Sequence, residues 1–427
     1  MGKMSVEELQ NRILEDLGVL AQVDDTPVPE AVGRCLAENV HAPINVPVFT
    51  RSAVDGYAIK SRDTEIASRE EPVMLDIIEK VTTGVVPRQR IQSGQATLVT
   101  TGAMLPRGAD AVVLVENVSA RGQQVIISDR VKKGEHVSVA GEDLGTGEAV
   151  LPKGHIVRLV DVAALSALGI SRIPVVRRPK VAIFSTGDEL VSPGHPLGPA
   201  QVYDANAYLL EAAVRESGGD AERLGTIPDR VEQVEMLLSD TAQSGRFDLI
   251  VTTGGTGASL LVLEGRDVEN IHDLIPGAIA KMGQLKSHGL LMVPGKPTAY
   301  GEIAGVPVFA LPGWPYSVIM TFQLFVAPAI RKMAGLPPLG AFREVRARLT
   351  QELMAEEGMR KYFQLSLKRE NGEIWAKPLL APRPPSAART IHQMLQGTGY
   401  FFLDGVSRTH VREGEWVQVV VDDPGWQ

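Results

Sequence analysis

The chain has 427 residues, which is more than one hydrophobic core usually organises, so we expect about three or four domains. Its 44% hydrophobic and 22% charged residues are typical of a folded soluble protein. The 43 Lys and Arg residues are outnumbered by 51 Asp and Glu residues, and no basic stripe is visible, so the composition argues against nucleic-acid binding.

The single cysteine and the distribution of apolar residues favour the cytoplasm. Cys35 cannot form an internal disulfide, which fits a reducing compartment, and we interpret it as a small buried hydrophobic residue rather than a nucleophile. The first residues, MGKMSVEELQ, contain no apolar signal-peptide core. Prolines interrupt the uncharged run at residues 303–330, so we expect a buried strand, turn and helix there and no membrane association.

The N-terminal part alternates between helical and β patterns. Ser5 and Glu8 form an S-x-x-E capping box, and the apolar residues after them follow helical spacing, which predicts an amphipathic helix that ends near Leu17. Residues 47–139 consist of short β-branched runs separated by glycine and charge, as in a small all-β domain. Residues 156–169 are helical again, and the prolines after them mark a domain boundary.

Strand and helix patterns alternate from residue 181 onward. The expected order is a strand at 181–184, a helix at 207–216, a strand at 248–253, a helix near Asp273, a strand at 306–311 and a helix from Ser317. This order predicts a parallel sheet with helices on both faces, and it places functional residues at the carboxyl ends of the strands. After the boundary AGLPPLG, residues 334–340, the chain alternates like a small β-barrel or sandwich.

The segment DLIVTTGGTG, residues 248–257, joins an apolar strand directly to a glycine-rich turn. Its glycines Gly254, Gly255 and Gly257 allow positive φ angles and close backbone approach, so successive N–H groups can line a phosphate. A tight strand-to-helix connection is the alternative explanation. Three similar segments, STGDEL (185–190), PGKP (294–297) and LPGWP (311–315), are expected nearby, and together they indicate a long anion-binding crevice.

Charged residues accompany these turns. The acidic ones are Asp188, Glu189, Asp204, Asp229 and Asp267. Carboxylates repel a phosphate unless a divalent cation lies between them, and oxygen ligands suit magnesium. Structural alternatives exist, since Asp229 can be a turn or N-cap acid before the next helix and Asp188 can cap a loop. We interpret Lys296 as a phosphate counter-charge, with a solvated loop lysine as the alternative.

A series of motifs in a fixed order carries a family resemblance. They are SAVDGYAI (52–59), TTGAMLPRGADAVV (100–113), GEDLGTGEAVLPKG (141–154), FSTGDEL, VYDAN, PGKP and LPGWP. In this order the chain resembles the molybdopterin molybdenumtransferase family, which includes the MoeA proteins and the E domain of gephyrin. The segment TTGGTG with the later GRDV is similar to the molybdopterin-binding motif of the small molybdopterin adenylyltransferase fold.

The resemblance implies a multidomain α/β plus β fold. Its expected parts are an N-terminal linker and dimerisation domain at 1–46 and 146–177, an inserted β domain at 47–145, a molybdopterin-binding α/β domain with a parallel sheet at 178–336, and a C-terminal β-barrel-like domain at 337–427. It also implies a homodimer with active sites between subunits. The implied reaction inserts molybdate into adenylylated molybdopterin with magnesium and releases AMP. The partner would be a molybdopterin adenylyltransferase or an acceptor molybdoenzyme.

The resemblance also assigns roles to individual positions. It makes Asp55, Thr101, Asp143 and Asp267 catalytic, with the first three facing the partner subunit's pocket, although the sequence alone supports an Asp-Gly turn at Asp55. It gives Glu189 and Asp229 to magnesium. The residues assigned to molybdopterin are Gly187, Asp188, Asp204, Gly254, Gly255, Thr256, Gly257, Gly295, Lys296, Pro297, Pro312, Gly313 and Pro315.

The chain departs from the family pattern at three places. The segment ASLLVLEG lengthens the loop between Gly257 and Asp267. Two lysines of the oxyanion site are replaced by Val293 and about Gly289, next to His288, and Gln364 stands where the family has an arginine. The candidate substitutes for these cations are Lys286, Arg266, Arg360, Lys361, Ser386 and Arg389. An insertase that handles tungstate, a paralogue that binds without turnover, and a scaffold protein remain as alternatives.

Overall fold

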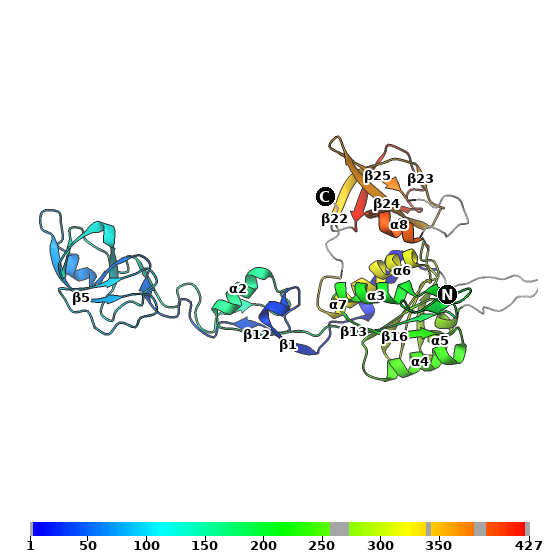
Figure 1. Cartoon of the computed structure of the whole chain (residues 1–427), viewed down its shortest axis with the longest axis horizontal. Helices are drawn as coiled ribbons and strands as arrows, with labels where there is room; N and C mark the ends of the chain where they lie inside the picture. Colours follow the sequence, from blue (N-terminus) through cyan, green and yellow to red (C-terminus); the bar gives the residue numbers. More distant parts are fainter. Residues whose placement is uncertain (1–2, 257–272, 339–342, 380–389, 423–427) are drawn as a thin grey trace, which may run out of the picture. The chain divides into compact units, whose positions relative to one another are not determined.

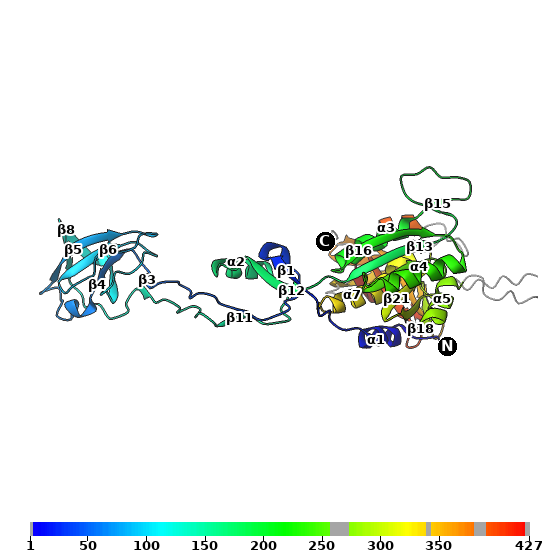
Figure 2. The same cartoon turned by 90° about the horizontal axis from the view of Figure 1, so that it is seen from below.

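The computed structural model describes residues 3–256, 273–338, 343–379 and 390–422. The chain divides into two compact units (Figures 1 and 2). One unit contains Met1–Asp24 and Val176–Gln427, and the other contains Asp25–Val175. The four-domain limits expected from the sequence stay a prediction. No helix within the described residues is long and apolar enough to cross a membrane.

The first unit contains a six-stranded mixed sheet in the order β16-β13-β17-β21-β20-β18. The parallel strands are β13 (Lys180–Thr186), β16 (Asp220–Ile227), β17 (Leu249–Thr253) and β21 (Val306–Leu311). The antiparallel strands β20 (Ala299–Ile303) and β18 (Gln284–His288) extend one edge. The predicted parallel sheet is therefore confirmed as the core of a larger mixed sheet.

Helices cover both faces of this sheet, as the alternation of strand and helix predicts. The helices are α3 (Ala205–Glu216), α4 (Val231–Gln243), α5 (Leu274–Met282), α6 (Pro315–Thr321), a π-helical turn η4 (Phe322–Val326) and α7 (Ala327–Met333). Successive side chains of a strand point to opposite faces. Val181 and Ile183 accordingly pack with α3, α6 and α7, whereas Ala182 and Phe184 pack with α4 and α5.

The N-terminal helix α1 (Val6–Asp16) joins the core of the α/β domain. The capping box is present, because the Ser5 hydroxyl accepts from the Glu8 backbone and the Glu8 carboxylate accepts from the Ser5 backbone. Leu9 and Ile13 are fully buried in the same apolar cluster as α3 and α7. The helix lies beside β18 (Figure 2).

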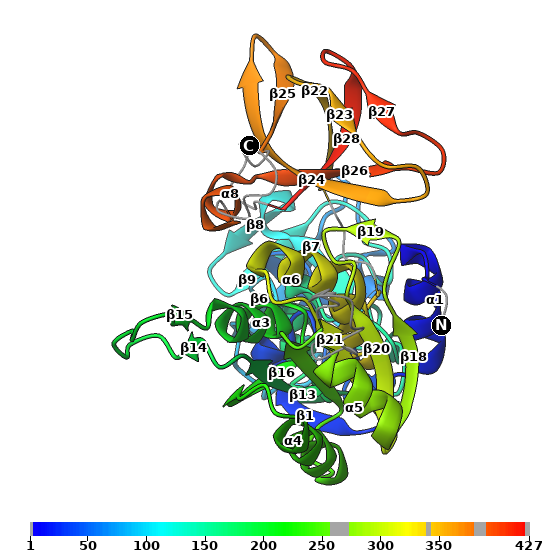
Figure 3. The ribbon, with the colours of Figure 1, turned by 90° about the vertical axis from the view of Figure 1, so that its right-hand side faces the viewer.

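The C-terminal part is a closed five-stranded barrel (Figure 3). Its strands are β22 (Arg343–Leu349), β24 (Arg360–Glu370), β25 (Glu373–Pro378), β26 (Gly399–Asp404) and β28 (Trp416–Val421). The ring runs β24-β25-β22-β28-β26, and the pairing of β26 with β24 closes it. Of the two predicted alternatives, the barrel is confirmed. Helix α8 (Thr390–Gln396) precedes β26, and β19 (Met292–Val293) adds to the edge of β24.

The second unit contains the small all-β region that the sequence predicts. Its sheet has the order β7-β4-β6-β5-β9-β8. The strands are β4 (Gly56–Ile59), β5 (Val73–Val81), β6 (Gln95–Val99), β7 (Ala111–Leu114), β8 (Val118–Arg121) and β9 (Gln124–Ile127). Outside this sheet, α2 (Leu159–Ala167) packs its buried Leu165 against a separate apolar cluster. Cys35 is buried, as expected, and burial raises the pKa of its thiol.

Candidate functional site

Three of the glycine-bearing turns begin side by side. Strands β13, β17 and β21 are parallel neighbours, with Ser185 opposite Thr253 and Thr253 opposite Leu311. The segments STGDEL, TTGG and LPGW therefore leave the sheet at its carboxyl edge. This is the edge at which ligands bind in open α/β sheets.

The PGKP segment reaches the same edge by a different route. Strand β20 is antiparallel to β21, and its first residue, Ala299, lies opposite Ala310 near the end of β21. Gly295 has φ +112° and packs so tightly that a Cβ atom there would lie 2.7 Å from Cγ2 of Thr321. Lys296 is exposed, so its ammonium group is accessible at this edge. Pro297 follows it and is half-buried.

Close packing explains why the TTGG turn contains glycine. Gly254 has φ +87° and Gly255 has φ +62°, and a Cβ atom on Gly254 would lie 2.4 Å from the Thr186 carbonyl oxygen. The N–H of Gly254 donates to the Leu311 carbonyl oxygen at 3.2 Å. Gly254 is thus required for the close approach of two strand ends, and its own N–H group is used within the protein. Thr256 is buried in the same turn.

Asn206 holds two of the turns together. Its side-chain Nδ2 donates to Oγ1 of Thr253 at 3.0 Å and to the Gly313 carbonyl oxygen at 2.7 Å. Because a carbonyl only accepts, this second bond determines which end of the amide faces Gly313. Thr253 in turn donates to the Pro312 carbonyl oxygen at 2.8 Å. The sequence reasoning missed Asn206, although it is the last residue of the VYDAN motif.

Asp204 has a structural role in this region. It is the N-cap residue of α3, is 4% exposed, and accepts from the Ala207 N–H at 3.0 Å. Its second oxygen accepts from Oγ1 of Thr226 at 3.4 Å. Asp204 therefore anchors the helix that carries Asn206, which is the usual function of an N-cap aspartate.

The two acids assigned to magnesium follow neighbouring strands. The Gly187 N–H donates to the Ile227 carbonyl oxygen at 3.1 Å, so the ends of β13 and β16 are joined. Glu189 and Asp229 each lie two residues beyond that bond, and both are exposed. The N-cap residue of α4 is Arg230, so the N-cap alternative for Asp229 is wrong.

The donor chemistry is compatible with magnesium. No group of three or more His, Cys, Asp or Glu side chains in the described parts of the chain is arranged to hold a metal ion. Magnesium in phosphate sites typically uses one or two carboxylates and completes its shell with phosphate oxygens and water. Two exposed carboxylates at adjacent strand ends fit that requirement. Asp188, between Gly187 and Glu189, is also exposed.

Lys286 does not replace a missing oxyanion-site lysine. Its Nζ donates to Glu302 at 2.7 Å and to Asp16 at 3.0 Å, and its side chain is 11% exposed. Burial opposes the charged form, but the bonds to both carboxylates outweigh burial and raise the pKa of Lys286. The ammonium group therefore joins α1 to the sheet. His288 ends β18 nearby, with its Nε2 3.9 Å from Oδ1 of Asp273.

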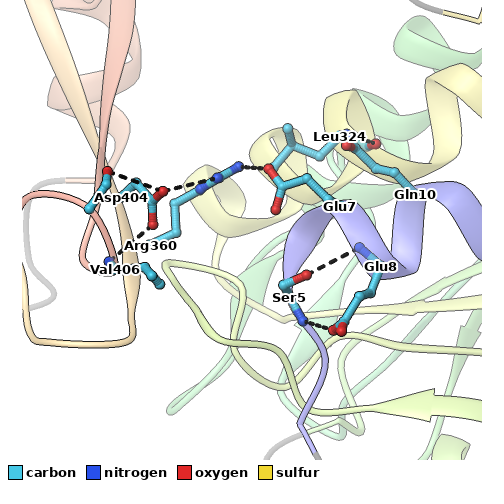
Figure 4. A network of polar contacts seen from close by, with 9 residues as sticks. Ser5, Glu7, Glu8, Gln10, Leu324, Arg360, Asp404 and Val406 are labelled. Atoms are coloured by element: carbon cyan, nitrogen blue, oxygen red, sulfur yellow. Dashed lines mark hydrogen bonds and ion pairs between the residues drawn. The ribbon is translucent and has the colours of Figure 1, made fainter.

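Arg360 and Lys361, two candidate cations of the barrel, also have partners within the protein. Arg360 forms an ion pair with Glu7 of α1 and lies 4.0 Å from Asp404 (Figure 4). Its guanidinium carbon is 4.6 Å from the centre of the Phe402 ring. The ammonium group of Lys361 lies 5.1 Å from the centre of the Phe363 ring. Gln364, expected where the family has arginine, is 9% exposed.

In the second unit, the structure brings Asp55 and Thr101 together. One carboxylate oxygen of Asp55 accepts from the Thr101 N–H at 2.7 Å and from its Oγ1 at 3.2 Å. Gly56 begins β4, and glycine is required there, because a Cβ atom would lie 2.0 Å from the Val113 carbonyl oxygen. Asp143 is exposed, and its N–H donates to the Val46 carbonyl oxygen at 3.0 Å.

Several expected residues lie outside the described residues. They are Gly257, Arg266, Asp267, Ser386 and Arg389. The roles assigned to the described site residues also stay predictions, since contacts within the protein do not identify a ligand.

Comparison with known proteins identifies the family. Residues 4–169 match the MoeA N-terminal region (domain I and II), and residues 182–332 match a probable molybdopterin binding domain. The chain is 35% identical over 376 residues to molybdopterin molybdenumtransferase 2 of Mycobacterium tuberculosis, covering 87% of this chain and 89% of the relative. It is 29% identical over 398 residues to molybdopterin molybdenumtransferase of Bacillus subtilis, covering 92% and 88%.

Solved structures agree with the sequence matches. The molybdopterin biosynthesis MoeA protein from Pyrococcus horikosii superposes with a TM-score of 0.82 at 31% identity, and the match covers 100% of both chains. A structure of molybdopterin biosynthesis MoeA protein from Pyrococcus horikoshii OT3 gives a TM-score of 0.71 at 29% identity, covering 98% of this chain and 100% of the other. The multidomain α/β plus β architecture, the ordered motifs and these matches show that the chain belongs to the molybdopterin molybdenumtransferase (MoeA) family.

Proposed function

We propose that the protein inserts molybdate into adenylylated molybdopterin, which yields molybdenum cofactor and releases AMP. The observation that supports this most directly lies at the carboxyl edge of the sheet, where hydrogen bonds from the Asn206 side chain join the TTGG and LPGW turns. Open α/β sheets bind nucleotides and similar ligands at this edge. The relatives named molybdopterin molybdenumtransferase support the same reaction and do not favour the alternatives.

The residues at this edge have complementary tasks in the proposal. Lys296 offsets phosphate charge, and the backbone of the glycine turns lies against the pterin nucleotide. Glu189 and Asp229 would hold magnesium, which as a Lewis acid polarises the phosphoanhydride. The carboxylates contribute oxygen ligands, while the tight turns exclude water from one side of the substrate.

The shared-site arrangement is part of the same proposal. We infer a cytoplasmic homodimer in which Asp55, Thr101 and Asp143 complete the pocket of the partner subunit, with Asp267 as a further catalytic acid. The bond between Asp55 and Thr101 supports a pre-formed pair. A molybdopterin adenylyltransferase would supply the substrate, and a molybdoenzyme would accept the product.

One assay tests the reaction. Purified protein is incubated with adenylylated molybdopterin, magnesium and either molybdate or tungstate, and AMP is measured by chromatography. Molybdate-dependent AMP release is the expected result. AMP release with tungstate alone would identify the tungstate-handling alternative, and tight nucleotide binding without AMP release under either condition would identify a paralogue that binds without turnover.

A further inference from the structure

An exposed tryptophan lies beside the joined turns. Trp314 is 58% exposed and directly follows Gly313, whose carbonyl oxygen accepts from Asn206. Gly313 also lies close to the TTGG turn, since a Cβ atom on it would be 3.9 Å from the Gly254 Cα atom. The backbone of Trp314 therefore begins where the two turns meet.

The backbone that carries this indole is held firmly. Pro312 and Pro315 flank the Gly313–Trp314 pair, and Pro315 confines the preceding Trp314 to an extended backbone, with φ −78° and ψ 127°. The Trp314 carbonyl oxygen accepts from the Val318 N–H at 2.9 Å, which fixes Trp314 as the N-cap residue of α6. The indole ring is therefore exposed although the turn that carries it is held by backbone hydrogen bonds.

The other described tryptophans and the nearby exposed tyrosines have partners. The Arg348 guanidinium lies 5.7 Å from the Trp375 ring and 5.3 Å from the Trp416 ring. Tyr208, on α3, is covered by Arg223 at 3.8 Å. Over residues 3–256, 273–338, 343–379 and 390–422, Trp314 has no ring stacking, cation–π contact or side-chain hydrogen bond.

Polar atoms next to this turn are also unsatisfied. Oδ1 of Asn206 and Oγ1 of Thr186 are buried and have no hydrogen-bond partner in the described structure. The Thr186 hydroxyl lies beneath the TTGG turn, because a Cβ atom on Gly255 would be 2.9 Å from it. Sites for small ligands combine an aromatic surface with a few such polar groups.

We propose that Trp314 is the stacking surface for the planar heterocycle of the phosphate-bearing ligand that binds at this edge. This inference rests on the proposed function and adds a binding residue to it. The shared chemistry is a flat, nitrogen-rich aromatic ring joined to phosphate, which either the pterin or the adenine of the substrate provides. Indole is well suited to this contact, because it offers a large flat surface and the ligand's heterocycle needs to present only its π-face to it.

Two probes and three variants test the proposal. AMP and 6-hydroxymethylpterin are titrated separately into wild-type protein, Trp314→Phe, Trp314→Ala and the control Trp416→Phe. Tryptophan emission reports stacking, and equilibrium dialysis reports affinity. At least one probe quenches the emission of wild-type protein and of Trp416→Phe, and the probe that does so identifies the stacked ring. The same quench is absent in Trp314→Phe.

Affinity separates stacking from mere proximity. Trp314→Phe keeps most of the affinity, whereas Trp314→Ala loses about tenfold for the quenching probe, the scale of one stacked base. Wild-type affinity in Trp314→Ala for both probes would overturn the proposal, as would a quench that persists in Trp314→Phe or failure of both probes to bind wild-type protein. The melting temperature stays unchanged, because the side chain is exposed.

Failure of this inference can be told apart from failure of the proposed function. Molybdate-dependent AMP release by wild-type protein, with unaltered probe binding by Trp314→Ala, would overturn the stacking role alone. A Trp314-dependent quench in a protein that never releases AMP would support the stacking role and overturn the proposed reaction.

Discussion

The side-chain amide of Asn206 donates to the Gly313 carbonyl oxygen at 2.7 Å, which ties the start of α3 to the turn after β21. The same amide group donates to Thr253, so three separate segments of the chain meet at one side chain. The shape of the candidate site depends on this residue as much as on the glycines around it.

Asn206→Ala should lower both stability and turnover. The substitution leaves the Gly313 carbonyl and the Thr253 hydroxyl without a donor, so the free energy of unfolding should fall by about 1–3 kcal/mol. Urea denaturation and AMP release measure the two effects. Asn117→Ala, at an exposed position, is the control and should stay within about 0.5 kcal/mol. Equal behaviour of the two variants would show that the Asn206 bonds contribute little.

Glu189→Gln and Asp229→Asn should reduce magnesium-dependent AMP release much more than nucleotide binding. Each substitution removes a ligand charge and nearly preserves shape. A magnesium titration of AMP release should shift to higher concentration in both variants. Asp240→Asn, an exposed acid on α4, is the matched control and should titrate like wild-type protein. Wild-type turnover and magnesium dependence in both site variants would contradict the assignment of magnesium to these carboxylates.

Asp267→Asn should lower turnover about a hundredfold without unfolding the protein, the scale of losing one positioned catalytic group. This prediction comes from the family resemblance, since Asp267 lies outside the described residues. AMP release and the urea midpoint are measured on the same preparation. An ordinary surface acid would instead change stability by no more than about 0.5 kcal/mol and leave turnover normal. Normal values of both quantities would mean that another residue, such as Glu264 three positions earlier, has the role, or that the pocket is not catalytic.

A shared active site should be visible by complementation. Light scattering at micromolar concentration should give twice the chain mass. Asp55→Asn and Glu189→Gln are compared at a low magnesium concentration at which each alone should release little AMP, whereas a refolded equal mixture should recover about a quarter of wild-type activity, because half of the dimers keep one intact site. An active monomer, or a mixture that stays inactive although mixed dimers form, would contradict the shared-site arrangement.

The segment around α2 should lose stability in acid through Asp161. The bonds from Arg158, followed by that from His155, hold the pKa of this 4% exposed carboxyl well below its usual range, although burial opposes them. The stabilisation is therefore fully present above the unfolded pKa of about 3.9 and is lost as pH falls through the lower folded value. Hydrogen exchange of the α2 amides between pH 5 and pH 2 measures this loss, after each rate is corrected for the pH dependence of intrinsic amide exchange.

Asp161→Asn provides the comparison for this pH dependence. The variant should be less stable than wild-type protein above the unfolded pKa, and the difference should shrink toward acid. A constant difference at every pH would mean that the charge of Asp161 is not responsible.

Local sequence patterns determined the elements of this protein. The Ser5–Glu8 capping box and the spacing of Leu9 and Ile13 define α1, because both act within a few residues along the chain. The alternation of apolar strands with helices likewise implies a parallel core with turns at one edge, because a helical crossover lets successive strands run parallel and parallel strands end at the same edge.

Only the tertiary structure decided how distant groups combine. The β alternation near the C-terminus allowed a barrel or a sandwich, and the pairing of β26 with β24 selects the barrel. The sequence left Lys286 as a candidate cation for the ligand, but the fold places it against Asp16, a residue far away in sequence. The partner of Asn206 is Gly313 for the same reason. Periodicity encodes which face of an element is buried, whereas the choice of partner depends on the packing free energy of the whole domain.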